Sequence, residues 1–176
     1  MAVKRILLLG NPILRAKCKK VTHFSSPATR STIRNLEDTL DDFRLRMGFG
    51  RGVAAPQIGS KLRIIFINPG GLGPLLNPVI TKRSSGRFSL WDDCFSFPDI
   101  LVKVRRYTWV EVSYQDEFGR KKRLRAKDAL SELLQHEIDH LDGILAFDRA
   151  NSSRHIVLRS ERRKIRRSFY GVNLRG

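Results

Sequence analysis

The stretch that decides the fold is His136-Glu137-Ile138-Asp139-His140, inside the longer segment Asp128–Leu141. Apolar residues recur in this segment at helical spacing, and Gly143 follows it as a stop signal. On such a helix His136 and His140 stand one turn apart on the same face, so both imidazoles can reach one metal ion. Glu137 could then take a proton from a water on that ion without being a ligand. The alternative is a helix that carries two histidines on its surface by chance.

Cys94 is the best candidate for a third ligand, because a catalytic metal site usually has three protein ligands and one open position. It lies between Asp92-Asp93 and Phe95-Ser96, where a core cysteine would be poorly placed. A free cysteine is nevertheless often a small buried hydrophobe, which is the alternative for Cys94. For Cys18, among lysines, we expect no functional role.

The rest of the chain predicts further helices and strands around the segment Asp128–Leu141. Apolar residues from Ile33 to Met47 recur at steps of three and four behind Ser25-Ser26-Pro27, which predicts a helix ending near Met47. A last helix is predicted over roughly Ser152–Phe169. Strands are predicted at Leu62–Asn68, Leu76–Thr81, Ile100–Val104, Tyr107–Gln115, Arg120–Arg125 and Ile144–Phe147. Strands whose helices do not alternate regularly with them indicate an α+β fold.

Composition limits the class of protein. A chain of 176 residues with 41% hydrophobic residues can bury one ordinary core, and its net charge of +17 excludes a neutral enzyme with no polyanionic partner. Two cysteines far apart exclude a disulfide scaffold and favour a reducing compartment. The longest apolar run near the start, Ile6–Leu9, is too short for a membrane span or a signal peptide. We therefore expect a cytoplasmic protein with no membrane partner.

A glycine-rich segment, Gly50-Arg51-Gly52-Val53-Ala54-Ala55-Pro56-Gln57, is a second candidate site. Its small residues let the backbone approach a ligand closely, and Gln57 offers an amide donor. The segment lacks the Lys-Ser/Thr pair of a phosphate-binding loop. An ordinary turn between a helix and a strand is the alternative.

Together, the glycine-rich segment, Cys94 followed by Ser96, and Gln135–Gly143 resemble the peptide deformylases, in the same order along the chain. The likeness extends to Gly10–Arg15 and to Leu76-Asn77-Pro78, so it covers nearly the whole sequence. It implies mixed, mainly antiparallel sheets around a central metal-binding helix, with N- and C-terminal helices.

The resemblance also implies an activity, the removal of the N-formyl group from the N-terminal methionine of nascent polypeptides. Cys94, His136 and His140 would hold one divalent metal ion, and Glu137 would be the general base and acid. The Gln57 side chain and the Phe95 backbone N–H would stabilise the oxyanion. Fe²⁺ is the expected ion, with Zn²⁺, Ni²⁺ or Co²⁺ as alternatives, because such a ligand set does not select one metal.

The chain departs from the family pattern near the expected site. The family's E-G-C-L-S is D-D-C-F-S here, so Asp92 keeps a carboxylate, for which Arg106 is a candidate partner, and Asp93 adds a charge beside the ligand. Arg51 and Glu132 stand where the family usually has apolar residues that line the methionine pocket. If both face the site, they should form an ion pair across its mouth; the alternative for Glu132 is a rim carboxylate in water. The expected substrate-binding residues are Gly50, Arg51, Gly52, Val53, Glu132 and Leu133.

The C-terminal segment is strongly basic. From Arg149 to Gly176 there are nine Lys or Arg residues and one acid. We therefore divide the chain into a catalytic domain, 1–148, and a basic helix and tail, 149–176, which could contact the ribosome or ribosomal RNA. The alternative for the tail is a solvated, solubilising surface. Two other functions remain open, an amidase for another N-formyl or acyl amide and a catalytically silent ribosome- or RNA-binding relative.

Overall fold

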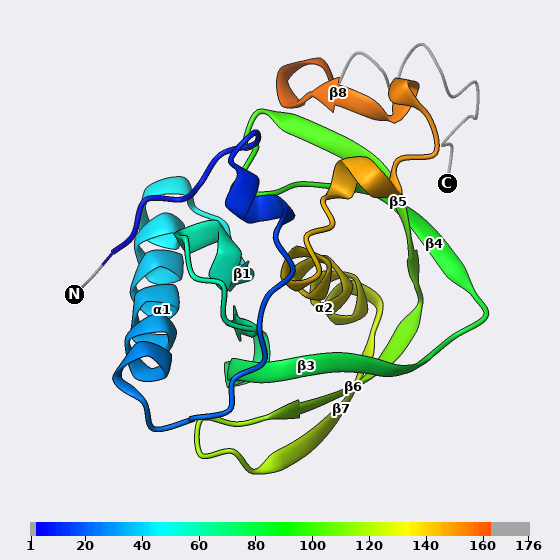
Figure 1. Ribbon diagram of the computed structural model, residues 1–176. Coiled ribbons are helices and arrows are strands. Elements are labelled where there is room, and N and C mark those ends of the chain that lie inside the picture. The colour runs from blue at the N-terminus through cyan, green and yellow to red at the C-terminus, as the bar shows by residue number, and fades with distance from the viewer. Residues whose placement is uncertain (1–2, 163–176) are drawn as a thin grey trace.

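The computed structural model describes residues 3–162 and contains two antiparallel sheets that flank a central helix (Figure 1). The first sheet has the order β1-β2-β3-β6-β7, and the second has the order β4-β5-β8. The strands are β1 (Gly52–Ala54), β2 (Ile64–Ile67), β3 (Gly73–Arg83), β4 (Arg87–Asp92), β5 (Ile100–Tyr107), β6 (Trp109–Gln115), β7 (Lys121–Lys127) and β8 (Ile156–Leu158). The α+β class and the mainly antiparallel sheets predicted from the sequence are confirmed.

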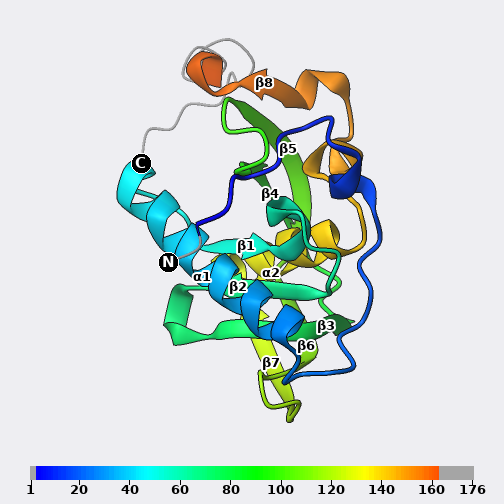
Figure 2. The same ribbon diagram turned by 60° about the vertical axis from the view of Figure 1, so that its left-hand side comes forward.

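Helix α1 (Pro27–Met47) forms where the apolar steps predict it and lies across β1 and β2 (Figure 2). The Ser26 side chain accepts a hydrogen bond from the Thr29 N–H, and this cap satisfies one of the free donors of the first turn. At the other end Gly48 takes a left-handed conformation and ends the helix. The buried stripe of α1 closes one face of the first sheet.

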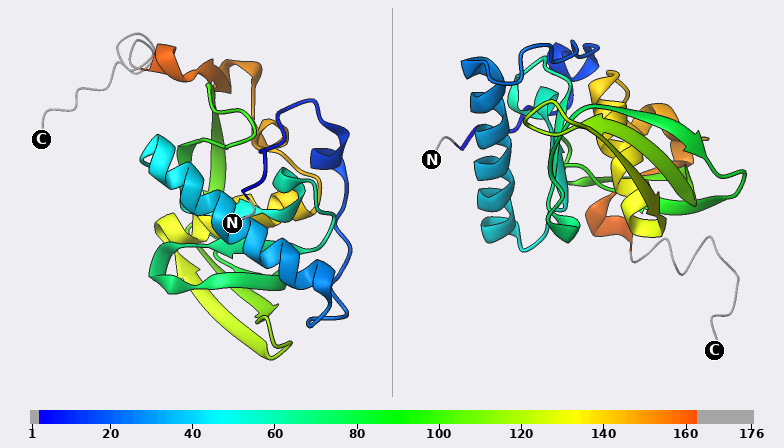
Figure 3. Two further views of the ribbon diagram at one scale, coloured as in Figure 1. Left: turned by 90° about the vertical axis from the view of Figure 1, so that its left-hand side faces the viewer. Right: turned by 90° about the horizontal axis from the view of Figure 1, so that it is seen from below.

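Strand β2 has two buried faces, because consecutive side chains of a strand point to opposite sides of its sheet. Ile64 and Phe66 pack in the cluster that includes the α1 stripe, whereas Ile65 and Ile67 pack in the cluster that includes α2. Figure 3 accordingly shows α1 and α2 (Asp128–Leu141) on opposite faces of the first sheet. The second sheet lies beyond α2, which is therefore enclosed by the rest of the fold.

The central helix has the bounds that the sequence predicts, and every residue from Ser131 to Leu141 is buried. Gly143 follows its end with φ +73°, and a Cβ there would lie 2.4 Å from the Arg15 carbonyl oxygen. Both facts require glycine, so the helix ends against the N-terminal segment. Within residues 3–162 we find no helix of the length and hydrophobicity needed to cross a bilayer.

Five predicted strands coincide with β2, β3, β5, β6 and β7, but β1, β4 and β8 were not predicted. Strand β1 has only three residues and lies inside the glycine-rich segment. Strand β4 alternates polar and apolar residues and pairs with β5 from Arg87–Tyr107 to Asp92–Val102. Strand β4 ends at Asp92, which lies against the central helix, and Cys94 follows two residues later at the same place. Short 3₁₀ helices complete the fold at Pro12–Arg15, Ala55–Ile58, Pro69–Gly71, Ala146–Arg149, Ser153–His155 and Arg159–Glu161.

The strand predicted at Ile144–Phe147 is wrong, because a 3₁₀ turn occupies Ala146–Arg149. The Asp148 carboxylate accepts the Leu145 N–H at 2.8 Å, and the Asp148 N–H donates to the Leu145 carbonyl at 2.9 Å. These local hydrogen bonds satisfy groups that a strand would need for its ladder.

The helix predicted over Ser152–Phe169 is also wrong in its described part. Ile156–Leu158 form β8, which pairs with Ile100–Val102 of β5. Arg159 fastens the end of this strand by donating its backbone N–H to Asp99 O at 2.7 Å and its Nε to Pro98 O at 2.8 Å. Residues 149–162 thus belong in part to the second sheet, and residues 163–176, which hold most of the basic tail, lie outside the described residues.

Candidate metal centre

The side chains of Cys94, His136 and His140 converge at the middle of the fold, and all three are buried. The His140 Nε2 lies 3.2 Å from the Cys94 Sγ and 3.2 Å from the His136 Nε2. Ligand atoms placed tetrahedrally at about 2.0–2.3 Å from one ion are about 3.3–3.8 Å apart. The two distances from His140 are close to this range, and all three atoms lie within 4.8 Å of one another, so they are near enough to share one ion. The residue set predicted from the sequence is therefore brought together by α2 and by the segment after β4.

A second contact orients His136, whereas the buried Nδ1 of His140 has no hydrogen-bond partner among residues 3–162. His136 Nδ1 lies 2.8 Å from Asp92 Oδ1, which directs its Nε2 toward the cluster. Burial disfavours a charged His136, but the adjacent Asp92 carboxylate outweighs burial and raises the pKa of His136 well above its usual value. For His140 burial prevails and lowers the pKa well below its usual value, so this ring keeps a free lone pair for a metal ion.

Asp92 is itself held by Arg106, whose Nη2 donates to Asp92 Oδ2 at 2.9 Å. Arg106 also pairs with Asp139, which accepts a further hydrogen bond of 2.6 Å from Arg149. Burial would raise the pKa of Asp92, but His136 and Arg106 together hold it below its usual range. The Asp92–Arg106 pair confirms the partner proposed from the sequence, whereas the role of Asp139 was missed although it lies within the decisive stretch.

Glu137 lies one residue after His136 and is 3% exposed. Its Oε2 has no hydrogen-bond partner, and burial raises its pKa to about 7. A Cβ on Gly52 would lie 3.0 Å from Glu137 Oε1 and 3.0 Å from the Ile67 Cδ1. Glycine at this position of β1 therefore allows the carboxylate to approach the strand. A buried, unpartnered carboxylate with this pKa can accept a proton near neutral pH.

Gln57 contacts the Cys94 sulfur, and Phe95 follows Cys94 in the chain. The Gln57 Oε1 accepts the Ala54 N–H at 2.8 Å, which turns its Nε2 toward Cys94 Sγ and Ser96 Oγ, each at 3.3 Å. Within residues 3–162 the Phe95 backbone N–H donates to no protein atom. Two donors thus adjoin the cluster. Ser96, which shares the Gln57 amide, was noted in the sequence only as part of the motif and was given no role at the site.

A cavity of about 240 Å³ opens beside the cluster. Its lining includes five of the six residues that the sequence analysis expects to bind substrate, Gly50, Arg51, Gly52, Glu132 and Leu133. Gly50 has φ +137°, and a Cβ there would lie 2.9 Å from the Phe95 ring, so glycine is needed for this wall. The Val53 side chain is instead fully buried among the residues that pack on α1, so its predicted role could fall only to its backbone.

The Arg51–Glu132 ion pair expected at the mouth is present. Arg51 Nη2 lies 2.8 Å from Glu132 Oε2, and Arg51 Nη1 donates to the Ala129 carbonyl at 3.0 Å. The Glu132 side chain is 7% exposed and the Arg51 side chain 44% exposed. The alternative of a solvated rim carboxylate is therefore wrong. Asp93, also at this cavity, pairs with Arg159 at 3.0 Å.

Comparison with known proteins agrees with this geometry. The family profile described as polypeptide deformylase matches residues 3–155. A peptide deformylase of Pelotomaculum thermopropionicum is 39% identical over 160 residues, which cover 89% of this chain and 97% of that protein. A second, of Heliobacterium modesticaldum, is 40% identical over 155 residues, covering 86% of this chain and 97% of that protein.

Solved structures give the same result. The crystal structure of the peptide deformylase of Thermotoga maritima superposes with a TM-score of 0.78 at 31% identity, covering 86% of this chain and all of that one. The enzyme of Synechococcus elongatus, solved in complex with actinonin, superposes with a TM-score of 0.78 at 34% identity, covering 88% of this chain and 82% of that one.

Proposed function

Because this chain belongs to the peptide deformylase family, we propose that Cys94, His136 and His140 hold its catalytic metal ion and that Glu137 transfers the proton. The protein is an enzyme, a hydrolase of N-formylmethionine peptides, and its relatives support this activity over the two alternatives. The family is metal-dependent. The observation that carries the residue assignment is the convergence of one sulfur and two imidazole nitrogens beside an unpartnered carboxylate.

Each residue has a task in hydrolysis of the formyl amide. A divalent cation bound by Cys94, His136 and His140 would lower the pKa of a coordinated water toward about 7. Glu137 takes the proton that the attacking water loses and returns it to the amine that leaves. The Gln57 amide and the Phe95 N–H would donate to the oxygen on which negative charge develops. Asp92 holds the His136 ring so that its Nε2 faces His140 and would be free to bind the ion.

The ion itself is proposed to be Fe²⁺, with Zn²⁺, Ni²⁺ or Co²⁺ able to occupy the same ligands, because thiolate and imidazole accept all four. We propose Gly50, Arg51, Gly52, Val53, Glu132 and Leu133 as the substrate-binding residues. The Arg51–Glu132 pair gives the pocket for the methionine side chain a polar wall. This wall should lower kcat/KM for formyl-Met peptides relative to formyl peptides whose first side chain is small or polar.

We also propose that the chain is cytoplasmic and that its basic tail contacts the ribosome or ribosomal RNA. Formylated nascent chains are the substrates that the activity implies, and both cysteines are free, as in a reducing compartment. The tail charges to be replaced are five of the nine, Arg162, Arg163, Lys164, Arg166 and Arg167. Neutralising them should weaken ribosome binding at low salt but leave the turnover of a short peptide unchanged; equal binding across a salt titration would refute this role.

The test of the mechanism is Glu137→Ala, assayed on formyl-Met-Ala-Ser with metal content measured in the same samples. We expect full metal content, an intact fold and a loss of turnover of about 10²–10⁴-fold. Glu117→Ala, which removes an exposed carboxylate from the turn between β6 and β7, is the matched control and should keep full activity. A metal-loaded Glu137→Ala enzyme with wild-type kcat would refute the assignment of the base.

A further inference from the structure

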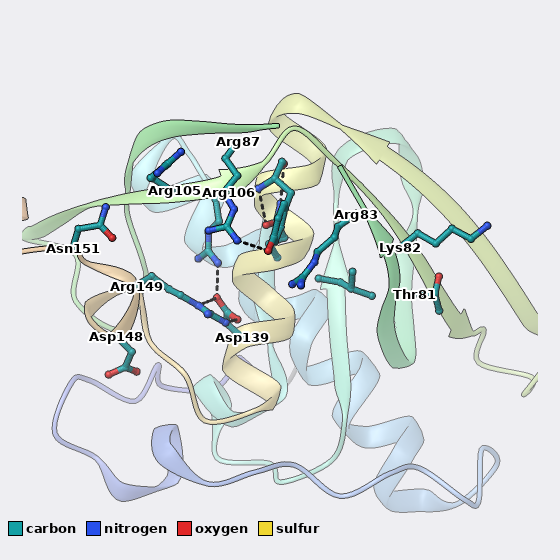
Figure 4. A pocket seen from close by; sticks show the side chains of 13 residues that line it. Thr81, Lys82, Arg83, Arg87, Arg105, Arg106, Asp139, Asp148, Arg149 and Asn151 are labelled. Carbon is teal, nitrogen blue, oxygen red and sulfur yellow. Dashed lines mark hydrogen bonds and ion pairs between the residues drawn. The ribbon is translucent and has the colours of Figure 1, made fainter. Parts of the chain in front are cut away.

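A cavity of about 670 Å³ lies on the face of α2 that carries Gln135 and Asp139, next to the face that carries the two histidines. Figure 4 shows Asp139 of this helix together with the basic side chains that line the cavity. Strands β3, β4 and β5 and the segment after α2 form its walls. We call it the basic cavity, because six basic side chains and only two carboxylates, Asp139 and Asp148, line it. The basic residues are Lys82, Arg83, Arg87, Arg105, Arg106 and Arg149.

Two of these basic residues are already neutralised. Arg106 pairs with Asp92 and Asp139, and Arg149 pairs with Asp139. These contacts belong to the support of His136 and leave no charge for another partner. The positive charge available to a ligand must therefore come from the remaining residues of the basic cavity.

Three arginines provide that charge. Arg83 and Arg87 lie over the ring of Tyr107, with their Cζ atoms 4.7 and 4.3 Å from its centroid, and Arg87 also hydrogen-bonds the Tyr107 hydroxyl. Arg105 has no charged partner among residues 3–162. Among the residues that the structure describes, none of these three arginines has a carboxylate partner, although they come from strands of both sheets. Lys82, the fourth, lies 3.8 Å from Glu111.

The Tyr107 ring holds two like charges in place before any ligand binds. Cation–π contacts fix the guanidinium groups, which lowers the entropy that an anion would have to remove on binding. The planar donors of arginine match phosphate oxygens in pairs. A site built in this way favours a phosphate-bearing ligand over a loosely held counterion.

The amount of charge favours a polyanion over a single phosphate. Once the ion pairs of the other lining residues are counted, Arg83, Arg87 and Arg105 leave an excess of three positive charges, more than the charge of about −2 on one phosphate group. Guanidinium groups already lie on Tyr107, the one aromatic side chain among these lining residues, so it is not free to stack a base. Binding at this site would therefore use backbone charge and not base identity.

We propose that the basic cavity binds the phosphodiester backbone of RNA, independently of sequence and separately from the C-terminal tail. RNA is favoured over other polyanions because the substrate is a nascent chain, and in this respect the inference rests on the proposed function. The cavity lies behind the metal centre, on another face of α2, so RNA there would leave the mouth beside Arg51 open to the peptide.

The test compares two triple variants of the full-length, metal-loaded protein in binding a fluorescent oligouridine across a salt titration. The cavity variant is Arg83→Gln, Arg87→Gln and Arg105→Gln. The control removes the same charge from the exposed part of β7, as Lys121→Gln, Lys122→Gln and Arg123→Gln. Inorganic phosphate and polyglutamate are added as competitors, and turnover of formyl-Met-Ala-Ser is measured on every sample.

The cavity variant should bind the RNA about tenfold to a hundredfold more weakly near 0.1 M salt, with a salt slope smaller by about 2, because each lost contact to a single strand removes about 0.7. The control should change affinity by about threefold or less, and neither variant should lose turnover. An arginine-to-lysine triple at the same positions should keep most of the affinity, which separates loss of charge from loss of fold.

Three results would overturn the proposal. Equal weakening by the cavity and control variants would mean that only net charge matters. Displacement of the RNA by inorganic phosphate would identify a site for a small anion, and equally strong displacement by polyglutamate would identify a site for an acidic protein. Deformylation of the free peptide is scored separately, so failure of RNA binding would not be confused with failure of the proposed function.

Discussion

The Arg51–Glu132 ion pair makes a sharp prediction about both stability and specificity. Arg51→Ile removes the cation and leaves the Glu132 carboxylate buried at 7% exposure. Removing one partner of a buried pair costs about 3–5 kcal/mol, because the other charge stays desolvated. Arg51 is itself 44% exposed, so solvent screens part of the interaction, and we expect a loss of about 1–3 kcal/mol in the free energy of unfolding.

The reverse change should be milder. Glu132→Ile removes the buried charge and lets Arg51 turn into water, so the expected loss is about 1 kcal/mol or less. The double variant buries no unpaired charge and should lie within about 1 kcal/mol of the wild type. A double-mutant cycle from urea denaturation of the four proteins then gives a coupling energy of about 1–3 kcal/mol.

The exposed pair Arg46–Asp42 on α1 is the matched control for this cycle. Its side chains are 64% and 31% exposed, and its coupling should be only about 0.3–0.5 kcal/mol. If the Arg51–Glu132 coupling is no larger than this control, the pair is solvated and our account of the cavity mouth is refuted.

The same variants test specificity. An apolar wall should accept the methionine side chain better, so the double variant should raise kcat/KM on formyl-Met peptides about tenfold relative to formyl-Ser peptides. The metal ligands are untouched, and metal content should not change. An unchanged ratio between the two substrates would show that the pair does not face the methionine side chain.

Three further predictions follow from the contacts of the site. Asp92→Ala should weaken metal binding about 10–100-fold in a chelator competition, since His136 loses its orienting partner; unchanged affinity would contradict this role. Gly52→Ala should lower kcat with metal retained, because the new methyl group lies 3.0 Å from Glu137 Oε1; wild-type kcat would contradict the tight fit. Burial raises the pKa of Cys18 from 9.0 to about 11, so the thiol of the folded protein stays neutral at pH values where the unfolded protein forms thiolate. At pH 8 Cys18 should therefore react with a disulfide reagent about 100-fold more slowly in the folded than in the unfolded protein. Equal rates would contradict its burial.

Local pattern predicted the central helix well because its signals lie within the helix. The apolar spacing from Leu130 to Leu141 predicts the buried part of the helix, and Gly143 predicts its end. The structure confirms both. The two histidines share a face for the same local reason. Cys94, in contrast, approaches them only through the pairing of β4 with β5, which spacing along the chain does not reveal.

Apart from the local 3₁₀ turn at Ala146–Arg149, the errors concern contacts between distant segments. Ile156–Leu158 lies in a charged region that suggests a helix, yet its three apolar residues add a strand to the edge of β5. The ion-pair network from Asp92 through Arg106 to Asp139 was only half foreseen, because Asp139 shows no signal apart from its place between two histidines. Strand pairing and buried charge networks depend on tertiary packing, which overrides local propensity.

The most direct test of the metal centre is X-ray absorption spectroscopy of the protein reconstituted with one divalent ion per chain. We predict one sulfur neighbour at about 2.3 Å and two imidazole nitrogens at about 2.0–2.1 Å. Cys94→Ser should lose the sulfur neighbour, whereas Cys18→Ser should keep it. A spectrum without sulfur, or one in which sulfur persists in Cys94→Ser, would contradict the assignment of Cys94, His136 and His140 as the ligands of this deformylase.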